Sequence, residues 1–223
     1  MSAKPASSGP AWKKEGESSK GLPLVPIILG VIALIAVIAV VATSVSNEED
    51  DATSQAASKQ QTAPVTISGD PLPELAGQDA AIGTKAPVVT GQTFDGTTIE
   101  ITDDGRPKVL VFLAHWCPHC QAEVPVLVDW SAENGMPEDV DVYGVSTSTN
   151  EERPNHPPSA WLDKEGWEYP TLADSPESQT ATAFGLSGFP FFVALDSDHQ
   201  VVARGSGELG TAEWESLLDL ARG

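Results

Sequence analysis

The longest hydrophobic segment of the chain lies near its N-terminus. No residue from Gly21 to Asn47 is charged, and the stretch Leu22–Ala42 is almost entirely apolar. About 20 apolar residues, rising 1.5 Å each, span a hydrocarbon core of roughly 30 Å. A buried core helix is normally shorter and has a polar face. The pattern therefore predicts a transmembrane helix over residues 22–44.

Charges on the two sides of this segment predict its orientation. Residues 1–21 contain four lysines, whereas four consecutive acidic residues, 48–51, follow the apolar stretch. Because Lys and Arg accumulate on the cytoplasmic side of membrane helices, we expect a cytoplasmic tail and an extracytoplasmic remainder. The alternative is a signal peptide cleaved near Ser44, although the apolar region of such peptides normally has 7–15 residues. We expect a single-pass protein of the cell membrane.

Hydrophobic side chains become sparse after the membrane segment. Residues 45–78 are rich in Ser, Thr, Ala, Gln and Asp and contain Pro64, Pro71 and Pro73. Such a composition buries too little apolar surface to offset the entropy of folding. We expect a flexible extracytoplasmic linker that holds a folded domain away from the membrane.

Short apolar runs alternate with amphipathic segments through residues 79–223, which we expect to form one domain. The run Lys108–Ala114 predicts a buried central strand, and the segment from Cys117 to a stop at Gly135 has helical spacing. The other expected elements are hairpins over 92–101 and 191–204, a strand over 140–147, an extended piece at 171–173, and helices over 158–166, 176–184 and 211–221. Strands that alternate with helices indicate an α/β domain.

Composition and charge exclude several classes of function. The 223 residues include 12 Lys and Arg against 32 Asp and Glu, a formal net charge of -20. Nucleic-acid binding needs a basic face that neutralises phosphates, so we exclude nucleic acid as a partner. The chain has two cysteines, Cys117 and Cys120, which are too few for a disulfide framework.

The candidate chemistry lies in the segment Trp116-Cys117-Pro118-His119-Cys120, between the predicted central strand and the first helix. Cys117 is expected at the helix N-terminus, where free N–H groups and the helix dipole stabilise a thiolate. The thiolate is the species that attacks a disulfide. Cys120, one turn further on, is expected to be more buried and to resolve the mixed disulfide. Pro118 suits the first helical turn, and a charged His119 would further favour the Cys117 thiolate.

Two other interpretations of the cysteine pair are an inert disulfide and half of a zinc site. A disulfide across four residues stabilises little, because the entropy gained grows with loop length. Zinc would need two further ligands, for which the candidates are His115, His156 and His199. We therefore predict redox chemistry that uses no metal and no organic cofactor.

Four segments carry a resemblance to a known family: GTKAP at 83–87 with Asp95-Gly96, FLAHWCPHC at 112–120, EVP at 123–125 and FGLSGFPFFVALD at 184–196. A CxxC motif followed about 70 residues later by Gly-Phe-Pro and an apolar strand is much more specific than CxxC alone. Through these segments, region 79–223 resembles the membrane-tethered TlpA/ResA-like group of thiol–disulfide oxidoreductases. The resemblance implies a thioredoxin fold, which is a central mixed sheet flanked by helices, and protein dithiol–disulfide oxidoreductase activity.

The resemblance also implies roles for individual residues. Pro190 matches the proline that is cis in this fold and faces the active-site sulfurs, and the backbone of Phe189 would pair with a client strand. Glu123 matches an acid placed near the cysteine pair, where it could move protons to and from the second cysteine. The alternative for Glu123 is a solvated helix carboxylate. We also expect Trp116 to shield one side of the first cysteine's sulfur.

The departures from the family pattern leave the direction of electron transfer open. Val111 stands where many cytosolic thioredoxins carry a buried Asp, so a proton relay must come from Glu123 or water. Pro118-His119 is the dipeptide of the oxidant DsbA, but about 26 residues between Val145 and Leu172 leave no room for its helical insertion. The protein either oxidises client proteins or reduces client thiols, of an apocytochrome or a metallochaperone, with electrons from a membrane redox partner. A third possibility is a binding module whose cysteines stay idle.

Overall fold

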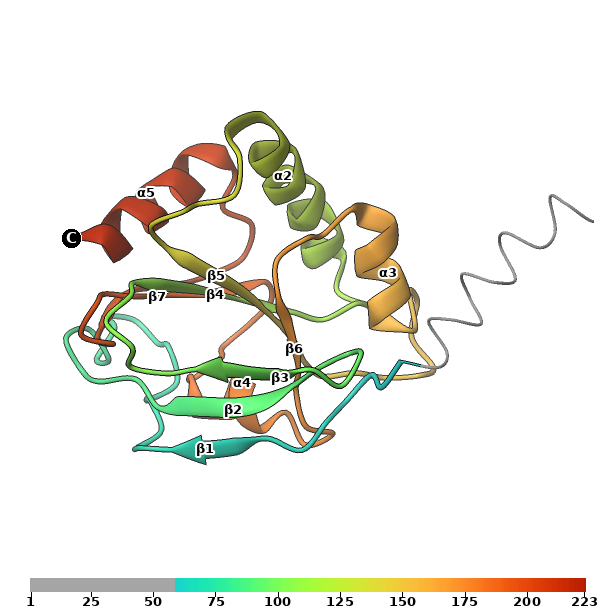
Figure 1. Ribbon diagram of the computed structural model, residues 1–223, viewed down its shortest axis with the longest axis horizontal. Coiled ribbons are helices and arrows are strands. Elements are labelled where there is room, and N and C mark those ends of the chain that lie inside the picture. Colours follow the sequence, from blue (N-terminus) through green and yellow to red (C-terminus); the bar gives the residue numbers. More distant parts are fainter. Residues whose placement is uncertain (1–58) are drawn as a thin grey trace, which may run out of the picture. The chain divides into compact units, whose positions relative to one another are not determined.

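The computed structural model describes residues 59–223 (Figure 1). A fully buried strand, β4 (Lys108–Leu113), lies at the centre of its sheet. It pairs in parallel with β5 (Asp141–Ser146) and antiparallel with β7 (Phe191–Leu195). A strand covered on both faces needs a continuous apolar sequence, which is the pattern that predicted it. The prediction of a central strand here is confirmed.

The sheet is mixed, as an α/β domain of this kind requires. Within residues 59–223 it contains eight strands in the order β1-β2-β6-β5-β4-β7-β8, and β3 pairs with β2. The remaining strands are β1 (Thr66–Ser68), β2 (Val88–Thr93), β3 (Thr98–Ile101), β6 (Thr171–Ala173) and β8 (Val201–Ser206). The antiparallel pairs β2–β3 and β7–β8 confirm the two predicted hairpins.

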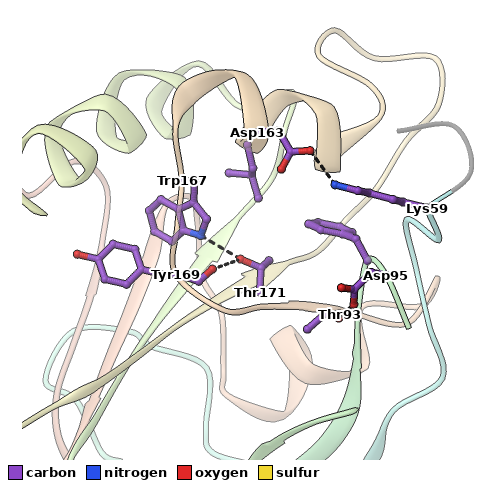
Figure 2. A pocket seen from close by; sticks show the side chains of 9 residues that line it. Lys59, Thr93, Asp95, Asp163, Trp167, Tyr169 and Thr171 are labelled. Carbon is purple, nitrogen blue, oxygen red and sulfur yellow. Dashed lines mark hydrogen bonds and ion pairs between the residues drawn. The ribbon is translucent and has the colours of Figure 1, made fainter. Parts of the chain in front are cut away.

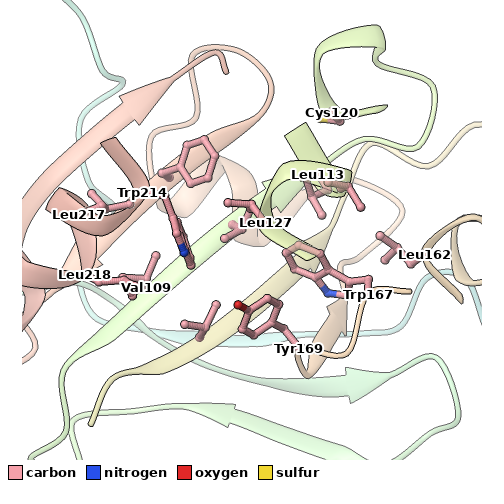
Figure 3. Close-up of a cluster of buried hydrophobic side chains, with 14 of the residues drawn as sticks. Val109, Leu113, Cys120, Leu127, Leu162, Trp167, Tyr169, Trp214, Leu217 and Leu218 are labelled. Carbon is pink, nitrogen blue, oxygen red and sulfur yellow. The ribbon is translucent and has the colours of Figure 1, made fainter. Parts of the chain in front are cut away.

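Helices cover both faces of the sheet (Figure 1). The helices are α2 (Pro118–Asn134), α3 (Pro158–Glu165), α4 (Gln179–Ala183) and α5 (Thr211–Arg222). Val109, Val111 and Leu113 of β4 pack with α2, α3 and α5, whereas Leu110 and Phe112 pack on the side of α4. This alternation follows the two-residue period of a strand. Figure 3 shows the first of these clusters, in which Trp167, Tyr169 and Trp214 surround Leu127 of α2.

Helix α4 is shorter than the sequence pattern predicted. We expected a helix over residues 176–184, but the helical turns begin at Gln179. Ser178 directly before it has a left-handed backbone, with φ 56° and ψ 44°. A residue in this conformation cannot continue a right-handed helix, so residues 176–178 form a turn instead.

The folded domain begins earlier than expected, so the prediction of a flexible linker is wrong for residues 59–78. Strand β1 pairs antiparallel with β2, and Leu72 is buried, with its N–H donating to the carbonyl of Ala183 at 2.8 Å. At the start of the described chain, Lys59 forms an ion pair with Asp163 at 2.7 Å, across the mouth of a pocket (Figure 2). An edge strand is held by backbone hydrogen bonds and a few apolar anchors, so its composition can remain that of a linker.

The tail 1–21, the predicted membrane helix 22–44 and residues 45–58 lie outside the described residues. Among the helices of residues 59–223, none is long and apolar enough to cross a bilayer. The membrane segment therefore stays a prediction from the sequence.

Candidate active site

The two cysteines lie where the central strand gives way to α2. Cys117 precedes the helix as its N-cap, with an extended backbone at φ -78° and ψ 120°, and Pro118 occupies the first turn. The Cys117 N–H donates to the carbonyl of Ala114 at 2.9 Å, which closes the turn after β4. Both cysteines are free thiols. The local sequence thus produces the predicted placement of a dithiol at a helix N-terminus.

The two thiols differ in their surroundings. Both belong to the core cluster, but Cys117 retains 6% exposure, whereas Cys120 has none (Figure 3). Burial strongly raises the pKa of Cys120, and the neighbouring Cys117 and Glu123 raise it further by charge. Cys120 is therefore held as a neutral thiol, as a resolving cysteine that waits for its partner to react would be.

Glu123 is a buried carboxyl group and not the solvated helix carboxylate that was the alternative. Its side chain is 1% exposed, and its Oε2 accepts a hydrogen bond from the N–H of Leu209 at 3.1 Å. Its Oε1 is buried and has no hydrogen-bond partner within the described part of the chain. Burial raises the pKa of Glu123, although backbone N–H groups of Leu209 and Gly210 oppose that shift. A buried carboxyl group with a raised pKa is a candidate for proton transfer.

The segment before β7 faces the first cysteine. The Phe189–Pro190 peptide bond is cis, as the family resemblance implied. The Cys117 Sγ lies 3.9 Å from the carbonyl oxygen of Phe189. The ring of Trp116 meets that of Phe189 edge-on, with centroids 5.8 Å apart. The structure thus brings together four of the predicted site residues: Trp116, Cys117, Phe189 and Pro190.

His119 faces away from the interior. Its side chain is 66% exposed, and its Nδ1 lies 2.6 Å from Oε1 of Glu208 in the loop between β8 and α5. The carboxylate that faces its ring was not anticipated from the sequence. The same loop also supplies Leu209, which donates to Glu123, so this loop is bonded to α2 at both His119 and Glu123.

His115 fastens the polar loop 147–157 beside the site. Its Nδ1 pairs with the carbonyl of Pro154 at 2.8 Å, and its Nε2 accepts from the N–H of Asn150 at 3.2 Å. These contacts require a neutral ring protonated on Nδ1, and burial lowers the pKa of His115 accordingly. Trp116 Nε1 donates to the carbonyl of Ser148 in the same loop at 2.8 Å. Through these contacts His115 and Trp116 make loop 147–157 part of the rim of the site.

The dithiol lies outside the pocket of Figure 2 and belongs to no metal-binding cluster within residues 59–223. The pocket in Figure 2, lined by Phe94, Trp167 and Thr171 among others, contains neither cysteine. No group of three or more His, Cys, Asp or Glu side chains in this region is arranged to hold a metal ion. Val111, the position of the missing Asp, is fully buried in the core cluster.

Comparison with known proteins identifies the family. Residues 81–218 match the Redoxin family. The chain belongs to that family. This redoxin is 31% identical over 134 residues to the "Thiol:disulfide interchange protein DsbE homolog" of Paracoccus denitrificans, covering 58% of this chain and 69% of that protein. It is 29% identical over 131 residues to the methylamine utilization protein MauD of Methylobacillus flagellatus, and spans 57% of it.

A solved structure agrees with this assignment. The thioredoxin-family thiol:disulfide interchange protein of Chlorobium tepidum superposes with a TM-score of 0.52 at 25% identity, covering 65% of this chain and 99% of that one. The fold of this redoxin is therefore thioredoxin-like, as the sequence predicted. Because its relatives are thiol:disulfide interchange proteins and it carries the dithiol, this redoxin is a thiol–disulfide oxidoreductase.

Proposed function

We propose that this redoxin exchanges disulfides with client proteins, with Cys117 as the nucleophile and Cys120 as the resolving thiol. One observation carries the proposal. Cys117 caps α2 within 3.9 Å of the Phe189 carbonyl, whereas Cys120 is fully buried with a raised pKa. A client strand that pairs with the backbone at Phe189 would bring its disulfide to the first sulfur and not to the second.

The proposed exchange has two steps. The Cys117 thiolate attacks a client disulfide, so that one client sulfur bonds to Cys117 and the other leaves and takes up a proton. The Cys120 thiol then gives up its proton and attacks Cys117, which releases the second client thiol and leaves a Cys117–Cys120 disulfide. Two electrons pass to the client. Glu123 is the proposed acceptor of the Cys120 proton, because it is buried beside that thiol and its pKa is raised.

We further propose that the reaction runs in this reducing direction. A strong dithiol oxidant is one whose reduced form is stabilised. Here burial and the Glu123 charge disfavour a Cys120 thiolate, and the ring of His119 lies against the Glu208 carboxylate, with Nδ1 2.6 Å from Oε1. Residues 59–223 contain eight Lys and Arg against 26 Asp and Glu, so the domain as a whole carries a strong negative charge. The oxidised protein then needs re-reduction by a dithiol donor, for which a membrane redox partner is the proposed source.

The proposed location is the extracytoplasmic side of the cell membrane. It is supported by the uncharged segment 22–44, by the lysines before it and by the acidic residues after it. Protein disulfides form and persist outside the cytoplasm, so a disulfide exchanger has its clients there.

Trapping experiments on the full-length chain test the exchange. Cys120→Ser is expected to accumulate a mixed disulfide between Cys117 and a disulfide-bonded client such as insulin, because the resolving thiol is absent. Cys117→Ser is expected to form no adduct and to lose insulin reduction. Full turnover by Cys117→Ser would refute the assignment, and an unmodified dithiol in the parent chain would favour a binding module with idle cysteines.

A further inference from the structure

Arg153 lies against the residue that precedes the first cysteine. Its guanidinium carbon stands 4.7 Å from the centroid of the Trp116 ring. The other contacts of that ring include the edge-on meeting with Phe189, whose carbonyl faces the Cys117 sulfur. Arg153 and Trp116 therefore form a stack beside the place where a client disulfide would react.

The backbone that carries Arg153 is fixed before any client arrives. Its own N–H donates to the carbonyl of Asn150 at 3.1 Å. Asn150 and Pro154, on either side, are both held by the buried ring of His115. Because the loop is already ordered, binding through Arg153 costs less entropy than binding through a mobile arginine.

Arg153 is also an uncompensated cation in an acidic protein. Six of the eight Lys and Arg residues within 59–223 form ion pairs with carboxylates. The two that form none in this region are Arg153 and Lys164, and Lys164 lies in the last turn of α3. The adjacent Glu151 and Glu152 are exposed and make no ion pair with Arg153. The described residues leave its guanidinium N–H groups free, and a guanidinium in this state binds a carboxylate through two parallel hydrogen bonds.

We infer that Arg153, stacked on Trp116, is a specificity-determining residue that binds an acidic side chain of the client next to the cysteine under attack. The inference rests on the proposed function, since it concerns the client of the same dithiol. The Trp116 ring holds the cation in place through its face, and the guanidinium edge remains available to the client. The rest of the domain is acidic and would repel an acidic client. Because charges are screened beyond about 8 Å at physiological salt, that repulsion is weak at the site and the attraction by Arg153 remains.

Three blocked peptides provide the test, each a symmetrical disulfide with Glu, Gln or Lys beside its cysteine. The reduced full-length chain donates two electrons, two peptide thiols are released, and the Cys117–Cys120 disulfide forms. Released thiol is measured at acid-quenched time points. We expect the Glu peptide to react about fivefold faster than the Gln peptide, which corresponds to about 1 kcal/mol for an exposed ion pair. The Lys peptide is expected to be slowest, and the preference should shrink as salt increases.

Variants separate binding by Arg153 from other effects. Arg153→Gln is expected to bring the Glu to Gln rate ratio close to one, whereas Arg153→Lys should retain part of it. Lys164→Gln, the matched change at the other unpaired cation, should leave the ratio unchanged. An unchanged ratio in Arg153→Gln would overturn the inference. A changed reduction potential in Arg153→Gln would overturn it too, because Arg153 would then act on the thiolate and not on the client. If the parent chain reduced none of the peptides, the proposed function itself would fail.

Discussion

Glu123 is the side chain to which the proposed function assigns the proton transfer. Its carboxyl group is buried in the first turns of α2, one oxygen accepts from the Leu209 N–H, and the other has no partner among the described residues. A buried and half-satisfied carboxyl group costs stability. It is suited to exchange a proton with the equally buried Cys120, whose pKa its charge raises.

Glu123→Gln is expected to slow the resolving step and to leave the first attack by Cys117 nearly unchanged. Gln cannot accept the Cys120 proton, and loss of such proton transfer typically costs about 10²-fold or more in rate. Rapid-quench measurement of mixed-disulfide decay on the full-length chain shows the effect. Glu133→Gln, an exposed change on the same helix, is the control, and equal decay rates in the two variants would contradict the role of Glu123.

Stability provides an independent check on the same variant. The raised pKa means that the folded state keeps the Glu123 proton longer than the unfolded chain does. The part of the unfolding free energy that this proton contributes is therefore lost as pH rises from the ordinary pKa of 4.5 through the raised pKa of the folded state. Urea unfolding should show Glu123→Gln to be at least as stable as the parent at pH 7, so slow resolution would not reflect misfolding.

Local sequence was sufficient to predict the residues that share a short segment. Cys117, Cys120 and Glu123 are placed by helical spacing, and the cis peptide before Pro190 was implied by the family resemblance. Arg153 and Glu208 were not predicted as site residues. They belong to loops far away in the sequence, and only the folded sheet brings Arg153 to Trp116 and Glu208 to His119. A lone arginine or glutamate in a polar loop carries no sequence signal of such a contact.

At the scale of elements, residues 59–79 form an N-terminal extension of the folded domain, and one buried arginine secures this extension to the domain. The side chain of Arg204 in β8 has no exposed surface. Its Nε donates to Asp79 at 3.0 Å, and its Nη1 donates to the carbonyls of Pro73 and Phe184, each at 2.9 Å. The arginine hydrogen bond lowers the pKa of Asp79. Residues 72–79 are thereby joined to β8 and to the end of α4.

Arg204→Gln is expected to destabilise the domain by about 3 kcal/mol, because it leaves a partly buried carboxylate and two carbonyls without their donor. Urea unfolding of the full-length chain measures the change. Arg222→Gln is the matched control, since its pairs with Asp139 and Asp219 are exposed and should contribute less than about 1 kcal/mol. Equal losses in the two variants would show that Arg204 does not secure the extension.

Most elements were predictable because many of their side chains share in a continuous apolar run or a periodic apolar pattern. Strand β4, helix α2 and the two hairpins have patterns that their burial enforces. Strand β1 was missed because it has three residues and is held by backbone pairing with β2. Such a strand needs no alternating apolar pattern in its own sequence, so the polar composition of the region led us to expect a linker there.

At the scale of the whole molecule, the uncharged segment 22–44 separates a basic tail from an acidic domain. We expect the protein to stay in the membrane pellet after a carbonate wash, because about 20 apolar residues are enough to span the bilayer. An unrelated peripheral protein that the wash releases serves as the control. Recovery in the soluble fraction with a new N-terminus near Ser44 would mean that the segment is a cleaved signal peptide.

The reduction potential of the Cys117–Cys120 couple tests the central claim most directly. The full-length chain is equilibrated with glutathione buffers, and the fraction of dithiol is read by alkylation. We predict a two-electron couple near about -270 mV, as in thioredoxin, because burial and the charge of Glu123 disfavour a thiolate at Cys120. A value near about -120 mV, as in strong oxidants, would contradict the reducing direction. A pair that never exchanges with glutathione would contradict disulfide exchange itself.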